Sequence, residues 1–348
     1  MDTIIRKLAL LDAGDLPILS IYLDVRPEAT GEKPEQRAGL VVLRDRLREI
    51  RRTFLPRGAD LDSFDADAAR INAFVAEKMD AATEGLAMFA CHGLGVWETV
   101  EARTPFENQV TVASRADLYQ LAKLDDEFER AIVGVLDTNT ARLYVYEYGA
   151  LFEADGPDDD PVHYQKRETG GWSQARYQRH IDKHRKDFAE EIVLAIGDLV
   201  EREDAHHIVL AGDEVVMSHL NRAMPTPLAE KVTGVFKAGI RTNVNDIAAE
   251  VAPIMEQAER DAGRSAVDRL VAEVRRGGLG VAGIEATGQA LENGQVDTLV
   301  IDDAKVGPVE RKELVRLAAA TSAGVEVVRD ATPLAELGGV GALLRYRL

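Results

Sequence analysis

The segment from Gln165 to Lys186 concentrates basic side chains in a chain whose formal net charge is −18. Seven lysines and arginines stand against only two acidic residues, Glu168 and Asp182, which gives the segment a local charge of +5. Such side chains typically contact the phosphates of nucleic acids. The segment is therefore a candidate RNA-binding site. Its basic residues are Lys166, Arg167, Arg176, Arg179, Lys183, Arg185 and Lys186.

Two glycines and a tryptophan interrupt this segment. Gly170 and Gly171 have no side chain, so the backbone there can approach a partner closely. Trp172 follows directly and offers a ring that can stack on an unpaired base. A simpler interpretation makes the glycines a loop before a helix, with Ser173 as the helix N-cap. The corresponding simpler interpretation of the basic run is a helix face that is exposed to solvent.

Charge distribution matters more than net charge for an RNA partner. A net charge of −18 argues against non-specific nucleic-acid binding, which depends on neutralising phosphates. A second basic stretch runs from Arg37 to Arg52, where six arginines stand against Asp45 and Glu49. Two like-signed clusters in so acidic a chain favour an anionic partner.

The remaining composition is that of an ordinary globular protein, with 46% hydrophobic and 29% charged residues. The single cysteine, Cys91, cannot form an internal disulfide, which fits a reducing compartment. Residues 1–15 are acidic where a secretory signal is basic, and no apolar run is long enough to cross a membrane. We therefore expect a cytoplasmic protein without a membrane partner.

Residues 1–125 read as an α/β domain. Pro17–Val25 is a predicted strand, and residues 35–54 and 64–80 have the apolar spacing of helices. Gly85–Cys91 and Val96–Val100 are predicted to pair across a turn. This domain shows no catalytic constellation.

Residues 126–262 are expected to form a mixed sheet with helices packed on it. Arg130–Leu136 is a continuous apolar run, and Ala141–Tyr148 alternates, so the two predict a hairpin. A helical pattern runs from Ser173 to Glu203, and His207–Ala211 is the next strand.

A charged helix is predicted at about 245–276, and residues 263–348 read as a compact α/β/α domain. The predicted strands are Asp297–Ile301 and Val325–Val328, separated by helices at 282–293 and 308–323.

Other motifs do not indicate a cofactor or a metal. Gly278–Gly283 matches the dinucleotide pattern G-x-G-x-x-G but follows a helix instead of a strand. His180–His184 and His206–His207 lack partners at metal-ligand spacing, which favours structural or surface histidines. The acidic loop Asp155–Asp160 lacks the glycine and glutamate of a calcium loop. We expect no cofactor and no metal.

Two stretches resemble a known family. Gly170–Arg179 (GGWSQARYQR), preceded by the hairpin and followed by the long helix, is similar to the middle domain of archaeal and eukaryotic class-I release factors. Ser173, Arg176 and Tyr177 match the continuation of the family's Gly-Gly-Gln tip. Glu292–Asp302 and Leu337–Tyr346 resemble the third domain of release factors and Pelota.

The resemblance implies three domains. The middle domain would have an RNase H-like fold with its tip loop at 165–180, and the C-terminal domain would resemble kink-turn-binding ribosomal proteins. The N-terminal domain carries no stop-codon-reading motif of true release factors. The basic stretch Arg37–Arg52 is, on charge alone, a candidate face for small-subunit rRNA.

The sequence departs from the family at the tip. The family's glutamine positions the water that attacks the peptidyl-tRNA ester, which is positioning and oxyanion-type stabilisation. Here Trp172 stands at that position, and an indole N–H can only donate a hydrogen bond. Gln174 comes two residues later, as in rescue hydrolases with a shifted glutamine.

Three functions follow from the resemblance. The first is a factor that occupies the A site of idle or stalled ribosomes, like hibernation factors of the Balon type, contacting rRNA and an EF-Tu-type GTPase. The second is a peptidyl-tRNA hydrolase for ribosome rescue that uses Gly170, Gly171 and Gln174. The third is a free-standing RNA-binding protein.

Overall fold

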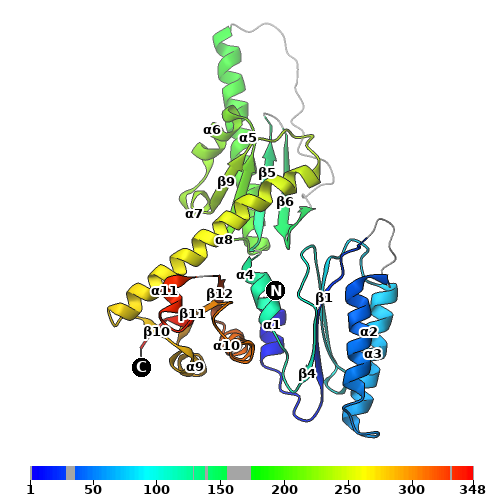
Figure 1. The fold of residues 1–348 in the computed structure, drawn as a ribbon. Helices are drawn as coiled ribbons and strands as arrows, with labels where there is room; N and C mark the ends of the chain where they lie inside the picture. The colour runs from blue at the N-terminus through cyan, green and yellow to red at the C-terminus, as the bar shows by residue number, and fades with distance from the viewer. Residues whose placement is uncertain are drawn as a thin grey trace. The chain divides into compact units, whose positions relative to one another are not determined.

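The computed structural model describes residues 2–28, 36–127, 129–137, 140–154, 174–329 and 331–347 (Figure 1). The described strands form three sheets with helices packed on them, which confirms the expected α/β class. Two compact units are present: unit 1 comprises Met1–Glu127 and Glu259–Leu348, and unit 2 comprises Phe128–Ala258. No helix in these ranges is long and apolar enough to span a membrane.

The first sheet of unit 1 is antiparallel, with the strand order β3-β2-β1-β4. Its core consists of alternate residues of β1, such as Leu19 and Ile21, packed against Leu43 and Phe64 of two helices. The predicted hairpin of β2 and β3 is confirmed. The elements are β1 (Ile18–Asp24), β2 (Gly85–Cys91), β3 (Val96–Ala102), β4 (Gln109–Ala113), α2 (Ala38–Arg51) and α3 (Ala59–Glu77).

One helix precedes the strands of this sheet in the sequence, and another follows them. They are α1 (Asp2–Ala9) and α4 (Tyr119–Glu127). The segment before α4 is tied to the sheet, because the Tyr22 hydroxyl donates to the Asp117 carbonyl over 2.7 Å. α1 contacts α10 (Pro308–Ala320), and α4 contacts α10 and β12 (Gly324–Val328), so both belong to the same compact unit as the C-terminal sheet.

The second sheet of unit 1 has the order β10-β13-β11-β12, with β11 parallel to β12 and antiparallel to β13. Gly341, in the closing glycine-rich motif, lies where a Cβ would come within 2.6 Å of the Val281 carbonyl oxygen and 2.7 Å of Leu270. A side chain therefore does not fit there. The remaining elements are β10 (Gly280–Ala282), β11 (Val296–Asp302), β13 (Val340–Leu344), α9 (Ile284–Glu292) and α11 (Thr332–Ala335).

Unit 2 has a mixed sheet with the order β7-β6-β5-β8-β9, as expected for this region. β5 pairs antiparallel with β6 and parallel with β8, and β5 is buried along its whole length. The predicted β5–β6 hairpin is confirmed. The strands are β5 (Ala131–Leu136), β6 (Ala141–Glu147), β7 (Ala150–Glu153), β8 (His207–Ala211) and β9 (Val232–Phe236).

Helices cover both faces of this sheet. Apolar residues of α5 and α6 pack on one face, and Ile247, Val251 and Met255 of α8 pack on the other. The helices are α5 (Gln174–Arg202), α6 (Glu214–Ala223), α7 (Thr226–Ala229) and α8 (Val244–Arg275). The boundaries expected at 125/126 and 262/263 stay a prediction.

Asp213 caps α6 and provides a test of local stability. Its carboxylate accepts a hydrogen bond from the Val216 backbone N–H over 2.9 Å. Asp213→Ala is expected to lower the free energy of unfolding by about 1 kcal/mol, because an N–H of the first turn loses its acceptor. Asp213→Asn keeps a side-chain acceptor and should be nearly neutral. Urea denaturation of both variants measures the difference, and equal losses would remove the capping role.

Candidate nucleic-acid interface at the start of helix α5

The second half of α5 anchors the helix on the sheet of unit 2. Phe188, Ile192 and Ile196 are almost fully buried and lie at the 4-residue spacing of one helix face. They pack against Ile132 of β5 and Leu210 of β8. The anchored half therefore fixes the direction of the whole helix.

The first half of α5 extends beyond the sheet (Figure 1). Phe188 is the first buried residue of α5 among those whose side chains are described. The fourteen residues from Gln174 to Asp187 precede it, which corresponds to about 21 Å of helix at 1.5 Å per residue. The anchored sheet thus presents a helical arm to a partner.

Three cations with described side chains lie on this arm, and two of them have no carboxylate partner among the described residues. Lys183 is exposed and Arg185 is half-buried, and neither forms an ion pair with another described residue. The Lys186 ammonium lies 3.5 Å from the Glu190 carboxylate, and 69% of its side chain remains exposed. An exposed pair of this kind contributes little stability and leaves the lysine available to a phosphate.

The second predicted basic stretch has a different character. Arg37 is buried, and its guanidinium donates to the carbonyls of Val25 at 2.8 Å, Thr83 at 2.9 Å and Ala81 at 2.6 Å. Arg37 therefore links its own segment to the backbone at Val25 and at Ala81–Thr83. The expectation that Arg37 lies on a basic face is wrong.

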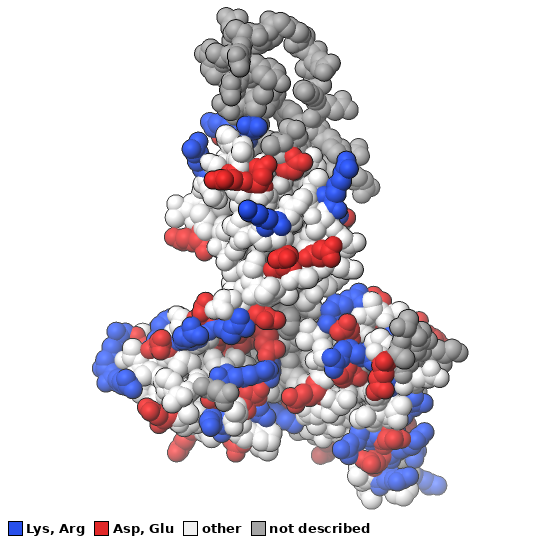
Figure 2. All heavy atoms as spheres, turned by 45° about the horizontal axis from the view of Figure 1, so that its top comes forward, with Lys and Arg blue, Asp and Glu red and all other residues white. Residues whose placement is uncertain are grey.

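Three further arginines of this stretch have carboxylate partners. Arg46 contacts Glu49 at 2.8 Å, and Arg48 contacts Asp45 at 3.0 Å. Arg51 contacts Asp65 of α3 at 2.7 Å, which holds the pKa of the Arg51 guanidinium above its ordinary value. Figure 2 shows basic and acidic side chains intermixed over unit 1 on the visible face. Three of the six arginines in this stretch thus have a carboxylate at ion-pair distance.

Several predicted site residues fall outside the described residues: Lys166, Arg167, Gly170, Gly171 and Trp172. The acidic loop at 155–160 and the Ser173 cap also fall there. Three others, Gln174, Arg176 and Arg179, have a helical backbone in α5, and their side chains are not described. Gln174 is the first residue of that helix.

The histidines of the middle region include one with a clear structural role. The His207 ring bridges Glu129, at 2.6 Å from Nε2, and Thr233, at 2.7 Å from Nδ1. The His207 hydrogen bond lowers the pKa of the Glu129 carboxyl, against the opposing effect of burial. The prediction of a structural or surface histidine is confirmed for His207.

One group of carboxylates in unit 1 lies close enough together to be considered as a metal site. Oxygens of Asp126, Glu259 and Glu326 lie within 4.8 Å of one another. Each of these residues already has other interactions; Asp126, for instance, accepts a hydrogen bond from the Val327 N–H over 2.7 Å. The Asp126 hydrogen bond ties α4 to β12.

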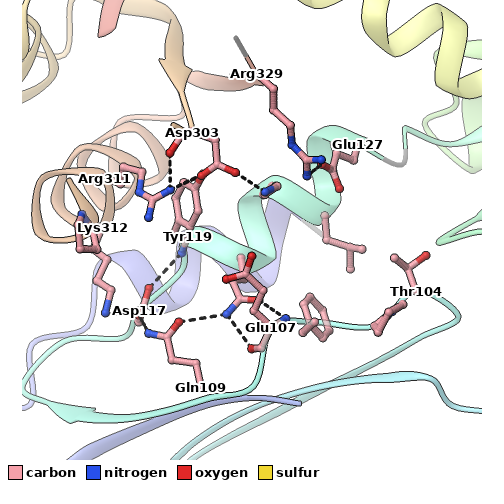
Figure 3. A pocket seen from close by; sticks show the side chains of 16 residues that line it. Thr104, Glu107, Gln109, Asp117, Tyr119, Glu127, Asp303, Arg311, Lys312 and Arg329 are labelled. Carbon is pink, nitrogen blue, oxygen red and sulfur yellow. Dashed lines mark hydrogen bonds and ion pairs between the residues drawn. The ribbon is translucent and has the colours of Figure 1, made fainter. Parts of the chain in front are cut away.

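A pocket that the sequence analysis missed is also in unit 1. It is lined by residues of the 104–127 and 303–329 segments, including Tyr119, Lys123, Asp303 and Arg311 (Figure 3). Its walls come from segments about 180 positions apart, so no spacing in the sequence indicates it.

Comparisons with known proteins agree with the resemblance of the middle region. Residues 117–263 match the family described as bacterial archaeo-eukaryotic release factor family 10. A Pelota homologue of Pyrococcus furiosus is 26% identical over 249 residues, which are 66% of this chain and 67% of the relative.

Solved structures of the same group also match. Pelota of Archaeoglobus fulgidus is 15% identical, covering 76% of this chain and 79% of its own, with a TM-score of 0.35. An archaeal Pelota in a ribosome-bound model with ABCE1 is 14% identical. The match covers 100% of this chain and 95% of that Pelota chain, with a TM-score of 0.47. Residues 117–263 are thus similar to the bacterial archaeo-eukaryotic release factor group, and the chain is similar to a Pelota homologue over 66% of its length.

Proposed function

We propose that this protein binds the A site of idle or stalled ribosomes and directs the 166–186 segment toward the peptidyl-transferase centre. The observation that carries the proposal is the helical arm of α5, which extends from an anchored core and carries Lys183 and Arg185, for which the described residues supply no carboxylate partner. Phosphates of rRNA are the partner that such an arm fits. The similarity to release factors and Pelota supports the ribosome as the source of that RNA.

Residues outside the described part of the chain are proposed to extend the same interface. Lys166 and Arg167 add two cations before the glycines, and Trp172 adds a ring for stacking on an unpaired base. The C-terminal sheet and its helices are the proposed contact for an EF-Tu-type GTPase. The function needs no cofactor, because binding alone blocks or protects the site.

Co-sedimentation tests the binding function. Purified protein is centrifuged with empty 70S ribosomes, and with ribosomes that carry peptidyl-tRNA in the P site, across a range of salt concentrations. Binding that falls steeply with salt, without release of peptide, is the expected result. Failure to co-sediment even at low salt would contradict the proposal and favour the free-standing RNA-binding protein.

Peptidyl-tRNA hydrolysis is the second candidate, and the position of Gln174 favours it. This residue opens α5, so it stands beside backbone N–H groups that lack helical acceptors and can stabilise an oxyanion. In this alternative, Gly170 and Gly171 bring the backbone close to the ester, and the Gln174 amide orients the water.

Peptide release from P-site peptidyl-tRNA separates the two candidates. Under the binding function, the wild-type protein and Gln174→Ala both release no peptide above background. Gln178→Ala is the matched control on the same helix. Release that is present in the wild type and in the control, but disappears in Gln174→Ala, would establish the hydrolase and contradict a purely binding role.

A further inference from the structure

A pocket of about 450 Å³ lies in unit 1, between α4, the loop that precedes β4 and the start of α10 (Figure 3). This volume is within the range of small-molecule sites, roughly 300–1,000 Å³. Arg311 and Lys312 lie on one side of the pocket and Thr104 on the other. None of these residues belongs to the helical arm of unit 2 that carries the proposed ribosome-binding function.

One wall of the pocket is fixed in place by Asp303. Its carboxylate accepts hydrogen bonds from the Tyr119 hydroxyl at 2.5 Å, from the Lys123 ammonium at 2.5 Å and from Arg311. The Arg311 guanidinium also stacks over the Tyr119 ring, 4.5 Å from its centroid. These contacts hold the wall before any ligand arrives, which reduces the entropy cost of binding.

Two other cations at the pocket keep unused hydrogen-bond donors. The Lys312 ammonium contacts Asp117 at 2.7 Å, and the Arg329 guanidinium contacts Glu127 at 3.1 Å. An ammonium has three donors and a guanidinium five, so one carboxylate contact does not exhaust either group. With 37% and 66% of these side chains exposed, the remaining donors can reach an anion such as a phosphate.

The opposite chemistry is supplied by Glu107. Glu107 is exposed and lines the pocket. Its carboxylate forms no hydrogen bond or ion pair with another described residue. A free carboxylate among cations disfavours a bare polyanion and accepts hydrogen bonds from hydroxyl groups. Carboxylates bind ribose hydroxyls in this way in nucleotide sites. Phe106 and Leu124 add apolar lining.

We infer that this pocket binds a mononucleotide, with its phosphate at Lys312 and Arg329 and its ribose hydroxyls at Glu107. The two kinds of polar group and the apolar lining match the three parts of such a ligand. A volume of about 450 Å³ admits one nucleotide.

Calorimetric titration of the full-length protein with AMP tests this inference, with adenosine and inorganic phosphate as partial ligands. AMP is expected to bind at least tenfold more tightly than either part, because only AMP engages both kinds of wall. Arg329→Ala and Glu107→Gln should each weaken AMP binding about fivefold to tenfold. Lys237→Ala and Glu292→Gln, exposed residues away from the pocket, are the matched controls.

The variants are chosen to keep the fold. Arg329 and Glu107 are both exposed, whereas loss of Lys312 would leave the buried Asp117 carboxylate without its cation. Absence of AMP binding up to about 10 mM would overturn the inference. Phosphate binding as tight as AMP binding, or equal AMP affinity in pocket and control variants, would also overturn it. No ribosome enters the experiment, so its outcome is independent of the proposed function.

Discussion

Replacing Arg176, Arg179 and Lys183 by glutamate is expected to weaken ribosome binding by about a hundredfold at moderate salt. Each phosphate contact contributes roughly 0.7–0.9 to the slope of log affinity against log salt concentration, so losing three contacts lowers that slope by about 2. The reduced slope is the more diagnostic quantity. Misfolding also lowers the affinity, whereas the slope depends on the number of phosphates that the protein contacts. Co-sedimentation or filter binding at several salt concentrations measures both values.

A control with the same change of charge is available in unit 1. Arg46, Arg48 and Arg51 are exposed arginines with carboxylate partners. Their combined replacement by glutamate alters the net charge as much as the first triple variant does. It should leave the salt slope unchanged, because these arginines lie on α2, outside the proposed interface of the α5 arm. An equal loss of slope in both triple variants would mean that overall charge, and not the α5 arm, governs binding.

Asp303→Ala is expected to lower the free energy of unfolding by about 3 kcal/mol. The substitution leaves the Lys123 ammonium and the Arg311 guanidinium, both with side chains at most 20% exposed, without their shared acceptor. The Tyr119 hydroxyl loses its acceptor as well. Uncompensated charges in a half-buried wall cost more than the original pairs contributed. Denaturant unfolding at neutral pH measures the loss.

The pH dependence of this effect has a definite sign. Burial opposes ionisation of Asp303, but the hydrogen bonds from Lys123 and Tyr119 outweigh it and hold the pKa of the carboxyl below its ordinary value. A carboxyl whose pKa is lower in the folded protein than in the unfolded chain stabilises the fold at pH values above its unfolded pKa, about 3.9. This stabilisation disappears as the pH falls through the pKa of the folded state. The difference between wild type and Asp303→Ala should therefore shrink below about pH 4.

Asp297→Ala is the matched control for this prediction. Asp297 lies in β11, the strand that ends directly before Asp303. Its side chain is 56% exposed, lies 3.7 Å from Arg345 and accepts a hydrogen bond from the Thr298 hydroxyl at 3.4 Å. Its removal should change the free energy of unfolding by less than about 0.5 kcal/mol. A loss as large as that of Asp303→Ala, or a loss in Asp303→Ala that does not vary below pH 4, would contradict the role of Asp303 as the anchor of the wall.

The elements buried on both sides were predictable from the sequence. β5 and β8 are continuous apolar runs because helices cover both faces of their sheet, and the α5 pattern repeats where Phe188 and Ile192 meet that sheet. β7 was missed because it follows β6 through Tyr148 and Gly149, both at positive φ. A tyrosine gives no signal for such a turn, since non-glycine residues rarely adopt this conformation.

The candidate sites were predictable only in part. The basic character of the α5 start was visible as a local excess of charge, whereas the burial of Arg37 was not, because a count of charges does not show what each one contacts. The Asp303 wall joins residues of α4 to residues about 180 positions later. Such a pairing depends on how two sheets pack, which local patterns do not determine.

The central claim, that the α5 arm enters the peptidyl-transferase region of the ribosome, is tested most directly by site-directed hydroxyl-radical cleavage. Lys186→Cys provides a site for an iron chelate on the exposed arm, and the native Cys91 is buried and will not react. With the labelled protein bound to empty 70S ribosomes, we predict cleavage of large-subunit rRNA around the peptidyl-transferase centre. Cleavage confined to other rRNA regions, from a protein that still co-sediments, would contradict the claim.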